Sequence, residues 1–227
     1  MKYFLILIVA AIGPTCQAAA EPAEKRTCRI VFPDRPNDAP KAAYLFDGKA
    51  SQPVNLPSMN FSEVIALPVG DITILMTPTA ITDSENPPPD APKLKIAEDV
   101  ENLYIIIKAD PLNTTLPLRI EMIDASDGKL KPGETLWSNL TDHEIVANLG
   151  GSKMSIAPKG HTVSKDPVPS SGYYKAEFSF QPEGKGDFQT ITQQNWWHDT
   201  KSRHIGFIVN TEGTLPRIFF YRDFRAP

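Results

Sequence analysis

Residues 174–181 read YKAEFSFQ, with an aromatic or small apolar residue at every second position and polar residues between them. Successive side chains of a β-strand point to opposite faces, so this alternation predicts a strand with one buried and one solvated face. The scheme recurs at 118–122 and nearly so at 72–76, and Asp-Gly pairs at 47–48 and 127–128 separate such runs. Short alternating runs divided by turn signals indicate an all-β sandwich or barrel.

Two runs are apolar at consecutive positions, LYIII at 103–107 and IFFY at 218–221. A strand of this kind is covered on both faces. We therefore expect both runs to be central strands and the deepest elements of the core.

The segment 141–156 has two interpretations. Thr141-Asp142-His143-Glu144 has the form of a helix capping box, and Gly150-Gly151 could end a two-turn helix. However, Ile145, Ala147 and Leu149 alternate, and Met154 and Ile156 could pair with them across the two glycines. We favour a β-hairpin over the helix.

The predicted strands fall into two groups of similar size. We expect an N-terminal domain at 21–126 and a C-terminal domain at 127–227, each an immunoglobulin-like antiparallel β-sandwich half, with one larger β-sandwich as the alternative. A proline-rich stretch at 82–92 has the composition of an exposed, extended loop. We place it inside the first domain, because the run at 103–107 is needed to complete that core.

Several stretches carry a resemblance. Residues 44–48 (YLFDG) followed by 67–72 (LPVGDI), and 136–141 (LWSNLT) followed by 149–151 (LGG), resemble secreted bacterial β-sandwich proteins of uncharacterised function. The likeness covers most of the chain after residue 20. It lies in turn glycines and strand aromatics, and it implies a fold without implying catalytic residues.

Composition restricts the partners. The 227 residues include 22 prolines, which argue against a mainly helical fold because proline removes a backbone donor. The chain has 23 basic and 27 acidic residues, a net charge of −4, and so offers no basic surface for nucleic acid.

The N-terminus predicts export. Lys2 precedes about ten apolar residues, and Ala18-Ala19-Ala20 supplies small side chains before Glu21, so residues 1–20 read as a signal peptide. The apolar run is too short to span a membrane, and no transmembrane segment is expected. We expect a secreted or periplasmic protein cleaved near Ala20, with a lipoprotein anchored at Cys16 as the alternative.

Cleavage near Ala20 would leave Cys28 as the one cysteine of the mature chain. An intrachain disulfide is then impossible. We interpret Cys28 as a small buried residue on a first strand, with a reactive thiol as the alternative.

Two pairs of adjacent aromatic residues could form a ligand platform: Tyr173-Tyr174 and Trp196-Trp197. Neighbouring side chains on a strand face opposite ways, so one member of each pair should face outward. Exposed rings of this kind would suit carbohydrate binding. The competing interpretation places all four in the core.

His198, Asp199 and His204 form the best candidate metal cluster. If a hairpin joins strands ending near Trp197 and beginning near Ile205, it brings the two imidazoles and the carboxylate together. The alternative is that all four histidines are surface residues or hydrogen-bond at strand ends. Likewise, we expect the charged residues near the C-terminus to be solvated, including Arg222 and Asp223.

The chain lacks a Gly-x-Ser-x-Gly elbow, a phosphate-binding glycine loop, His-Glu-x-x-His and Cys-x-x-Cys. We expect no cofactor and a binding or assembly function rather than catalysis, with an envelope protein or an envelope glycan as the partner. Addition of a partner segment to a sheet edge needs no motif, and it predicts an uncapped, flat edge strand. The alternatives are a carbohydrate-binding module and a metal-assisted hydrolase.

Overall fold

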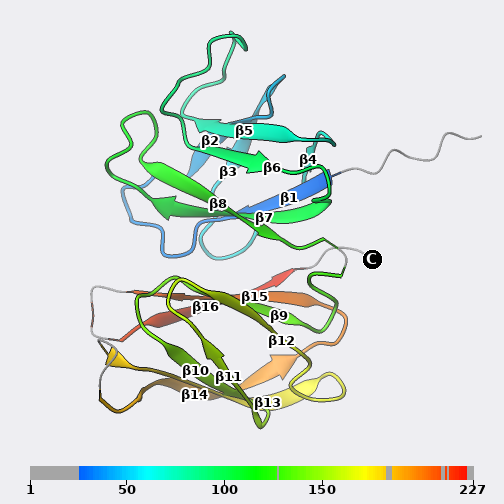
Figure 1. Cartoon of the computed structure of the whole chain (residues 1–227), viewed down its shortest axis with the longest axis vertical. Helices are drawn as coiled ribbons and strands as arrows, with labels where there is room; N and C mark the ends of the chain where they lie inside the picture. The colour runs from blue at the N-terminus through cyan, green and yellow to red at the C-terminus, as the bar shows by residue number, and fades with distance from the viewer. Residues whose placement is uncertain (1–25, 127, 183–185, 211–212, 214, 224–227) are drawn as a thin grey trace, which may run out of the picture.

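The computed structural model describes residues 26–126, 128–182, 186–210, 213 and 215–223. Within these ranges the regular structure consists of sixteen β-strands in four four-stranded sheets, without a helix (Figure 1). The predicted all-β fold built of β-sandwich halves is confirmed.

The first eight strands form the N-terminal sandwich. One of its sheets has the order β4-β1-β7-β8 and the other has the order β3-β2-β5-β6. The strands are β1 (Arg26–Val31), β2 (Ala42–Phe46), β3 (Ser51–Asn55), β4 (Ile65–Leu67), β5 (Ile72–Thr77), β6 (Lys93–Ile96), β7 (Asn102–Ala109) and β8 (Leu118–Asp124).

The remaining eight strands form the C-terminal sandwich. Its sheets have the orders β12-β9-β15-β16 and β11-β10-β13-β14. The strands are β9 (Thr135–Asn139), β10 (Ile145–Leu149), β11 (Ser152–Ile156), β12 (His161–Ser164), β13 (Gly172–Phe180), β14 (Gln189–His198), β15 (Arg203–Val209) and β16 (Arg217–Asp223).

The two sandwiches have the same topology, since adding eight to each strand number of the first gives the strand order of the second. In each, the first strand lies parallel to the seventh, β1 beside β7 and β9 beside β15. Parallel neighbours need a long crossover, which the five intervening strands provide. The prediction of antiparallel sandwich halves is therefore wrong for one pair of strands in each sandwich, because that pair is parallel.

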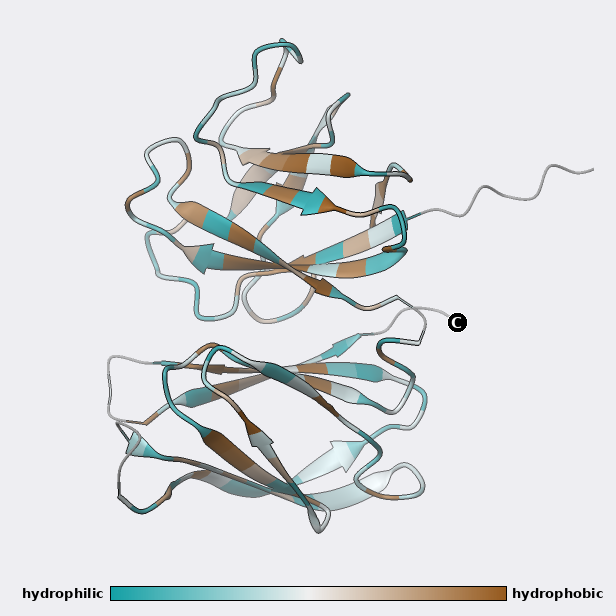
Figure 2. Ribbon diagram, in the orientation of Figure 1, coloured by the Kyte–Doolittle hydropathy of each residue, from teal (hydrophilic) through white to brown (hydrophobic). Residues whose placement is uncertain are grey.

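The four sheets stack as layers (Figure 1). Strand β7 shows why: Leu103, Ile105 and Ile107 enter the core of the N-terminal sandwich, whereas Tyr104 and Ile106 join a cluster that includes Phe207 of β15. The sheet containing β7 therefore packs against the sheet containing β15, and the brown apolar segments of Figure 2 line this junction. The prediction of a two-sided strand at 103–107 agrees with this burial.

Polar contacts also cross the junction. The Arg29 guanidinium on β1 lies 2.5 Å from a carboxylate oxygen of Asp223 on β16. The Tyr104 hydroxyl donates to the other oxygen of that carboxylate, and the Asp223 side chain is fully shielded from solvent. The prediction that Asp223 is solvated is wrong, because the second sandwich is covered by the first at this strand.

Strand β16 contains the apolar run at 218–221, and the prediction that this run forms a central strand is wrong. It lies at the edge of its sheet, next to β15, and Ile218, Phe219 and Phe220 are only half-buried. Both of its faces carry apolar residues because one faces the C-terminal core and the other faces the junction. The central strand is β15, whose last six residues are all buried.

The predicted hairpin at 145–156 is present, and the helix alternative is wrong. Ile145 pairs with Ile156 and Ala147 with Met154 in an antiparallel ladder. Gly150 and Gly151 form the turn with φ of +59° and +95°, a region that disfavours other residues. A side chain at Gly150 would also meet the carbonyl of Pro167.

The proline-rich stretch joins β5 to β6 and is exposed over most of 82–90. Both ends of this loop nevertheless pack against the N-terminal sandwich. Ala91 and Ile81, at its two ends, pack with Phe46 and Leu75 on the outer face of the β3-β2-β5-β6 sheet. The ends of the loop thus cover part of this face.

Residues 1–20, including Cys16, lie outside the described residues. Cys28 lies on β1 with no exposed surface and packs in the N-terminal core. Within the described part of the chain, no helix is long and apolar enough to cross a membrane.

Candidate binding surfaces of the C-terminal sandwich

The two aromatic pairs lie opposite each other on β13 and β14. Tyr173 pairs with Trp197, and Tyr174 with Trp196. Tyr173 is 72% exposed and Trp197 is 51% exposed, whereas Tyr174 is buried and Trp196 packs against the core. A ligand could therefore reach Tyr173 and Trp197, and the other two rings serve the core.

The exposed pair carries an energetic cost. The two rings meet edge to face with centroids 5.0 Å apart. A tryptophan can bury up to about 250 Å², so leaving half of Trp197 in water forgoes about 3 kcal/mol of hydrophobic stabilisation. Two exposed rings in contact offer flat apolar surface on which a ligand ring could stack.

Polar side chains continue the same face along β13. Glu177 accepts hydrogen bonds from Asn148 Nδ2 on β10 at 3.0 Å and from Gln193 Nε2 on β14 at 2.5 Å, and Lys175 Nζ lies 2.6 Å away. Lys175, followed by Asn148 and Gln193, lowers the pKa of Glu177 against the effect of burial. Glu177 is thus an ionised acceptor at neutral pH, held by three strands.

A shallow depression of about 600 Å³ adjoins Glu177. It is lined by Val146, Ala147, Asn148, Lys153, Met154, Ser155, Glu177 and Ser179. The Oδ1 atom of Asn148 is buried and lacks a hydrogen-bond partner among the described residues. The outer face of this sheet therefore combines exposed rings, an anchored carboxylate and a hollow.

One edge of this sheet is formed by β14, which is the longest of the described strands, and the other edge is formed by β11. Its ten residues, QTITQQNWWH, contain no Lys, Arg, Asp, Glu or Pro. In the described part of the chain β13 is its one strand neighbour, and the register is continuous from Thr192 to His198 beyond a shift at Phe178/Ser179. The side of β14 that faces away from β13 thus presents a long row of backbone N–H and C=O groups with which another strand can pair.

The other edge strands are protected by charge, proline or shortness, the devices that prevent unwanted pairing. Strands β4 and β12 have three and four residues. The other five carry a proline or a charge: Pro53 in β3, Lys93 and Lys95 in β6, Arg119 and Glu121 in β8, Lys153 in β11, and Arg217 and Arg222 in β16. Only β14 among the described edges has none of these features.

An apolar seam runs beside β14. Ile191 and Trp196 of β14 and Ile218 and Phe220 of β16 are half-buried, and all four pack on the C-terminal core. The rings of Trp196 and Phe220 lie 5.3 Å apart between the two sheets. Because β14 and β16 are both edge strands, this side of the sandwich is bounded by partly exposed apolar side chains.

The structure brings together only two of the three residues of the predicted metal cluster. His198 and His204 come together, with ring centroids 6.5 Å apart, but Asp199 pairs with Arg222 and accepts from Ser202 Oγ at 2.9 Å. The predicted hairpin is wrong, because β14 and β15 belong to different sheets and residues 199–202 cross between them. Among the described residues, no three His, Cys, Asp or Glu side chains are grouped to hold a metal ion.

The surface prediction for the histidines is wrong for this pair, which lies at strand ends but is 2% and 3% exposed. Asp166 Oδ1 lies 3.1 Å from His198 Nε2, outside hydrogen-bond geometry, and Nδ1 of His204 has no partner in the described chain. Burial, and secondarily the nearby His198, lower the pKa of His204 to about 4. His204 is therefore a neutral core residue, stacked on Phe220 at 5.0 Å.

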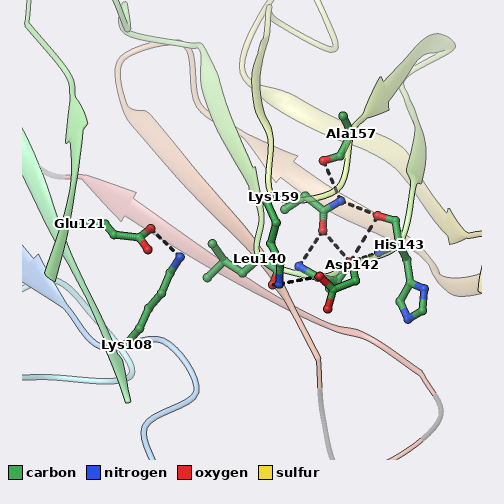
Figure 3. A network of polar contacts seen from close by, with 9 residues as sticks. Lys108, Glu121, Leu140, Asp142, His143, Ala157 and Lys159 are labelled. Carbon is green, nitrogen blue, oxygen red and sulfur yellow. Dashed lines mark hydrogen bonds and ion pairs between the residues drawn. The ribbon is translucent and has the colours of Figure 1, made fainter. Parts of the chain in front are cut away.

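A small cavity of about 100 Å³ lies between the sandwiches and has Lys108 and Lys159 in its lining. Lys108 is paired with Glu121 at 2.5 Å, and Lys159 lies 3.1 Å from Asp142 and donates to the Leu140 carbonyl (Figure 3). Each ammonium group is thus compensated by a carboxylate. The cavity has no excess positive charge with which to bind an anion.

No protein-family model matches the chain, and no curated protein matches it. The resemblance to secreted bacterial β-sandwich proteins stays a prediction. The fold and surfaces define the class, a protein of two β-sandwiches with an unprotected edge strand.

Sequence reasoning missed Glu177 and the edge position of β14. The outward position of Glu177 follows from the alternation at 174–181, but its partners Asn148 and Gln193 are 29 and 16 residues away in the chain. The absence of charge over 189–198 was a signal in the sequence. Its meaning depends on strand order, which alternation does not reveal.

Proposed function

We propose that the protein is a non-catalytic binding or assembly protein of the cell envelope that adds an extended segment of a partner protein to β14. The observation that carries the proposal is the contrast between β14 and the other described edges. β14 combines ten residues with no charge and no proline. An extended segment beside it would gain main-chain hydrogen bonds without requiring particular side chains.

The seam defines what the partner segment must look like. Alternate side chains of an added strand would point inward beside Trp196 and Ile191 and cover the exposed parts of Phe220 and Ile218. Apolar residues are favourable there, and charged residues are costly. The expected partner is an extended segment with apolar residues at every second position and polar residues between.

The predicted export supports an envelope role. We infer that the mature chain, from Glu21 onward, lies in the periplasm or outside the cell, because residues 1–20 have the sequence pattern of a signal peptide. Lipidation at Cys16 is the alternative route to the same compartment.

The test uses the chain 21–227 in a crosslinked pull-down from the native envelope fraction, read by mass spectrometry. Gln194 is exposed on the inward side of β14, beside Trp196, so Gln194→Lys adds a charge that the free protein tolerates and an added strand would bury. Asn195→Lys is the matched control, one residue along and on the outer face. We expect one enriched protein that Gln194→Lys loses and Asn195→Lys keeps.

Hydrogen exchange then locates the contact. The captured partner should slow exchange of the backbone amides within 192–198. Equal capture by both lysine variants, or protection confined to other strands, would contradict strand addition at β14.

A further inference from the structure

We propose a second site, independent of the β14 edge: the outer face of the β11-β10-β13-β14 sheet binds a glycan chain, with Tyr173 and Trp197 as its aromatic end. These two rings are the exposed aromatic side chains of the face, and they stand on adjacent strands. Because they meet at 79°, they form a corner in which one ring offers its face to a sugar and the other forms a wall.

Hydrogen-bonding groups extend from this corner in rows across the strands. Lys175 and Asn195 form the next row, and Glu177, Asn148 and Gln193 form the one after it. From Tyr173 to Ser179 the face measures about 20 Å, at roughly 3.4 Å per residue. This length accommodates several sugar units in succession.

The polar groups are suited to hydroxyls. Glu177 is fixed by three donors and remains an acceptor, because the same donors lower its pKa. The exposed amide of Gln193 offers both a donor and an acceptor. Asn148 lines the adjoining depression and donates to Glu177, so the depression opens directly beside this row of polar groups.

The same chemistry argues against a protein partner on this face. Lys153, Lys175 and Glu177 occupy its middle, and Lys and Glu are depleted at the cores of protein interfaces. Two rings do not make a large apolar patch. A glycan needs ring stacking and many hydrogen bonds, which is what the face provides.

The test measures binding of the chain 21–227 to oligomers of glucan, mannan, xylan and chitin and to peptidoglycan glycan strands, by affinity electrophoresis and calorimetry. We expect at least one of these to bind, and Trp197→Ala and Tyr173→Ala each to weaken binding by about tenfold or more. Phe188→Ala removes an exposed aromatic ring that precedes β14 and lies at the other end of this strand from Trp197, and it should leave the affinity unchanged.

Gln194→Lys separates this site from the proposed function, since it should abolish strand addition and leave glycan affinity intact. Trp197→Ala should do the reverse. If no glycan of the set binds the wild-type chain, or if Trp197→Ala binds as tightly as wild type, the glycan site is refuted, whatever happens at β14.

Discussion

The two sandwiches share one topology and differ at corresponding places. Strand β6 in the first and β14 in the second occupy the same position, yet β6 has four residues and two lysines whereas β14 has ten residues and no charge. In the first sandwich β6 also lies against β8, the counterpart of β16. The repeated strand order therefore does not determine which sheet edge is open to pairing, because the composition and length of the edge strands differ between the two sandwiches.

The outer faces differ in the same way. In the first sandwich the ends of the proline-rich loop cover Phe46 and Leu75. On the corresponding sheet of the second, Tyr173 and Trp197 remain in solvent. Strand β6 and the outer face of its sheet are therefore guarded in the first sandwich, whereas β14 and the outer face of its sheet are exposed in the second.

The largest expected effect comes from breaking the junction between the two sandwiches. Asp223→Ala leaves the Arg29 guanidinium and the Tyr104 hydroxyl without their shared carboxylate, and should cost about 4 kcal/mol of unfolding free energy. All three tryptophans lie in the second sandwich, so their fluorescence reports its unfolding in urea. Exposed Asp142→Ala is the control; equal midpoints for the two variants would show that the junction is not a stabilising contact.

A substitution inside the second sandwich should have the next largest effect. Gly206 on β15 leaves room for the Trp137 ring, and a Cβ atom there would lie 2.1 Å from a ring carbon. Trp137 is fully buried, so Gly206→Ala should cost about 3 kcal/mol through overpacking. Urea unfolding followed by tryptophan fluorescence measures the cost. A variant as stable as the wild type would mean that the ring moves aside freely.

Acid should destabilise the second sandwich through His204. Its pKa is lowered to about 4 in the folded chain, so the neutral form is favoured there and stability is lost as the pH falls from about 6.5 towards 4. Because the side chain is buried, the loss should reach about 2 kcal/mol by pH 5. Fluorescence-detected unfolding at pH 7 and pH 5 measures it. His204→Gln should flatten this dependence, and exposed His161→Gln should preserve it.

The smallest effect should come from loosening the loop over the first sandwich. Ile81 is half-buried and packs with Phe46 and Leu75, so Ile81→Ala should cost about 1 kcal/mol. Hydrogen exchange should then speed up in β2 and β5 and stay unchanged in β13. Unchanged exchange in β2 and β5 would show that the loop does not protect that face.

The sequence was informative where burial is local to a strand. Alternation at 174–181 and the apolar run at 103–107 correspond to β13 and β7. The run at 218–221 misled, because coverage on both faces occurs at an edge strand when two sandwiches pack together.

The surfaces were less accessible to such reasoning. The pairing of Tyr173 with Trp197 depends on the register between β13 and β14, and the burial of His198 and His204 depends on a crossing between two sheets. Arg29 and Asp223 are 194 residues apart in the chain. Contacts of this kind follow from the order of strands, and no short pattern encodes that order.

The presence of one unguarded edge strand among those described has a consequence for stoichiometry. Among the described strands only β14 offers a free, unguarded edge, so a partner strand added there finds no second such edge on the same molecule. A molecule with one acceptor edge terminates a chain of subunits instead of propagating it. Complexes formed through β14 should therefore be closed one-to-one pairs, which sedimentation would reveal as a single species of fixed mass.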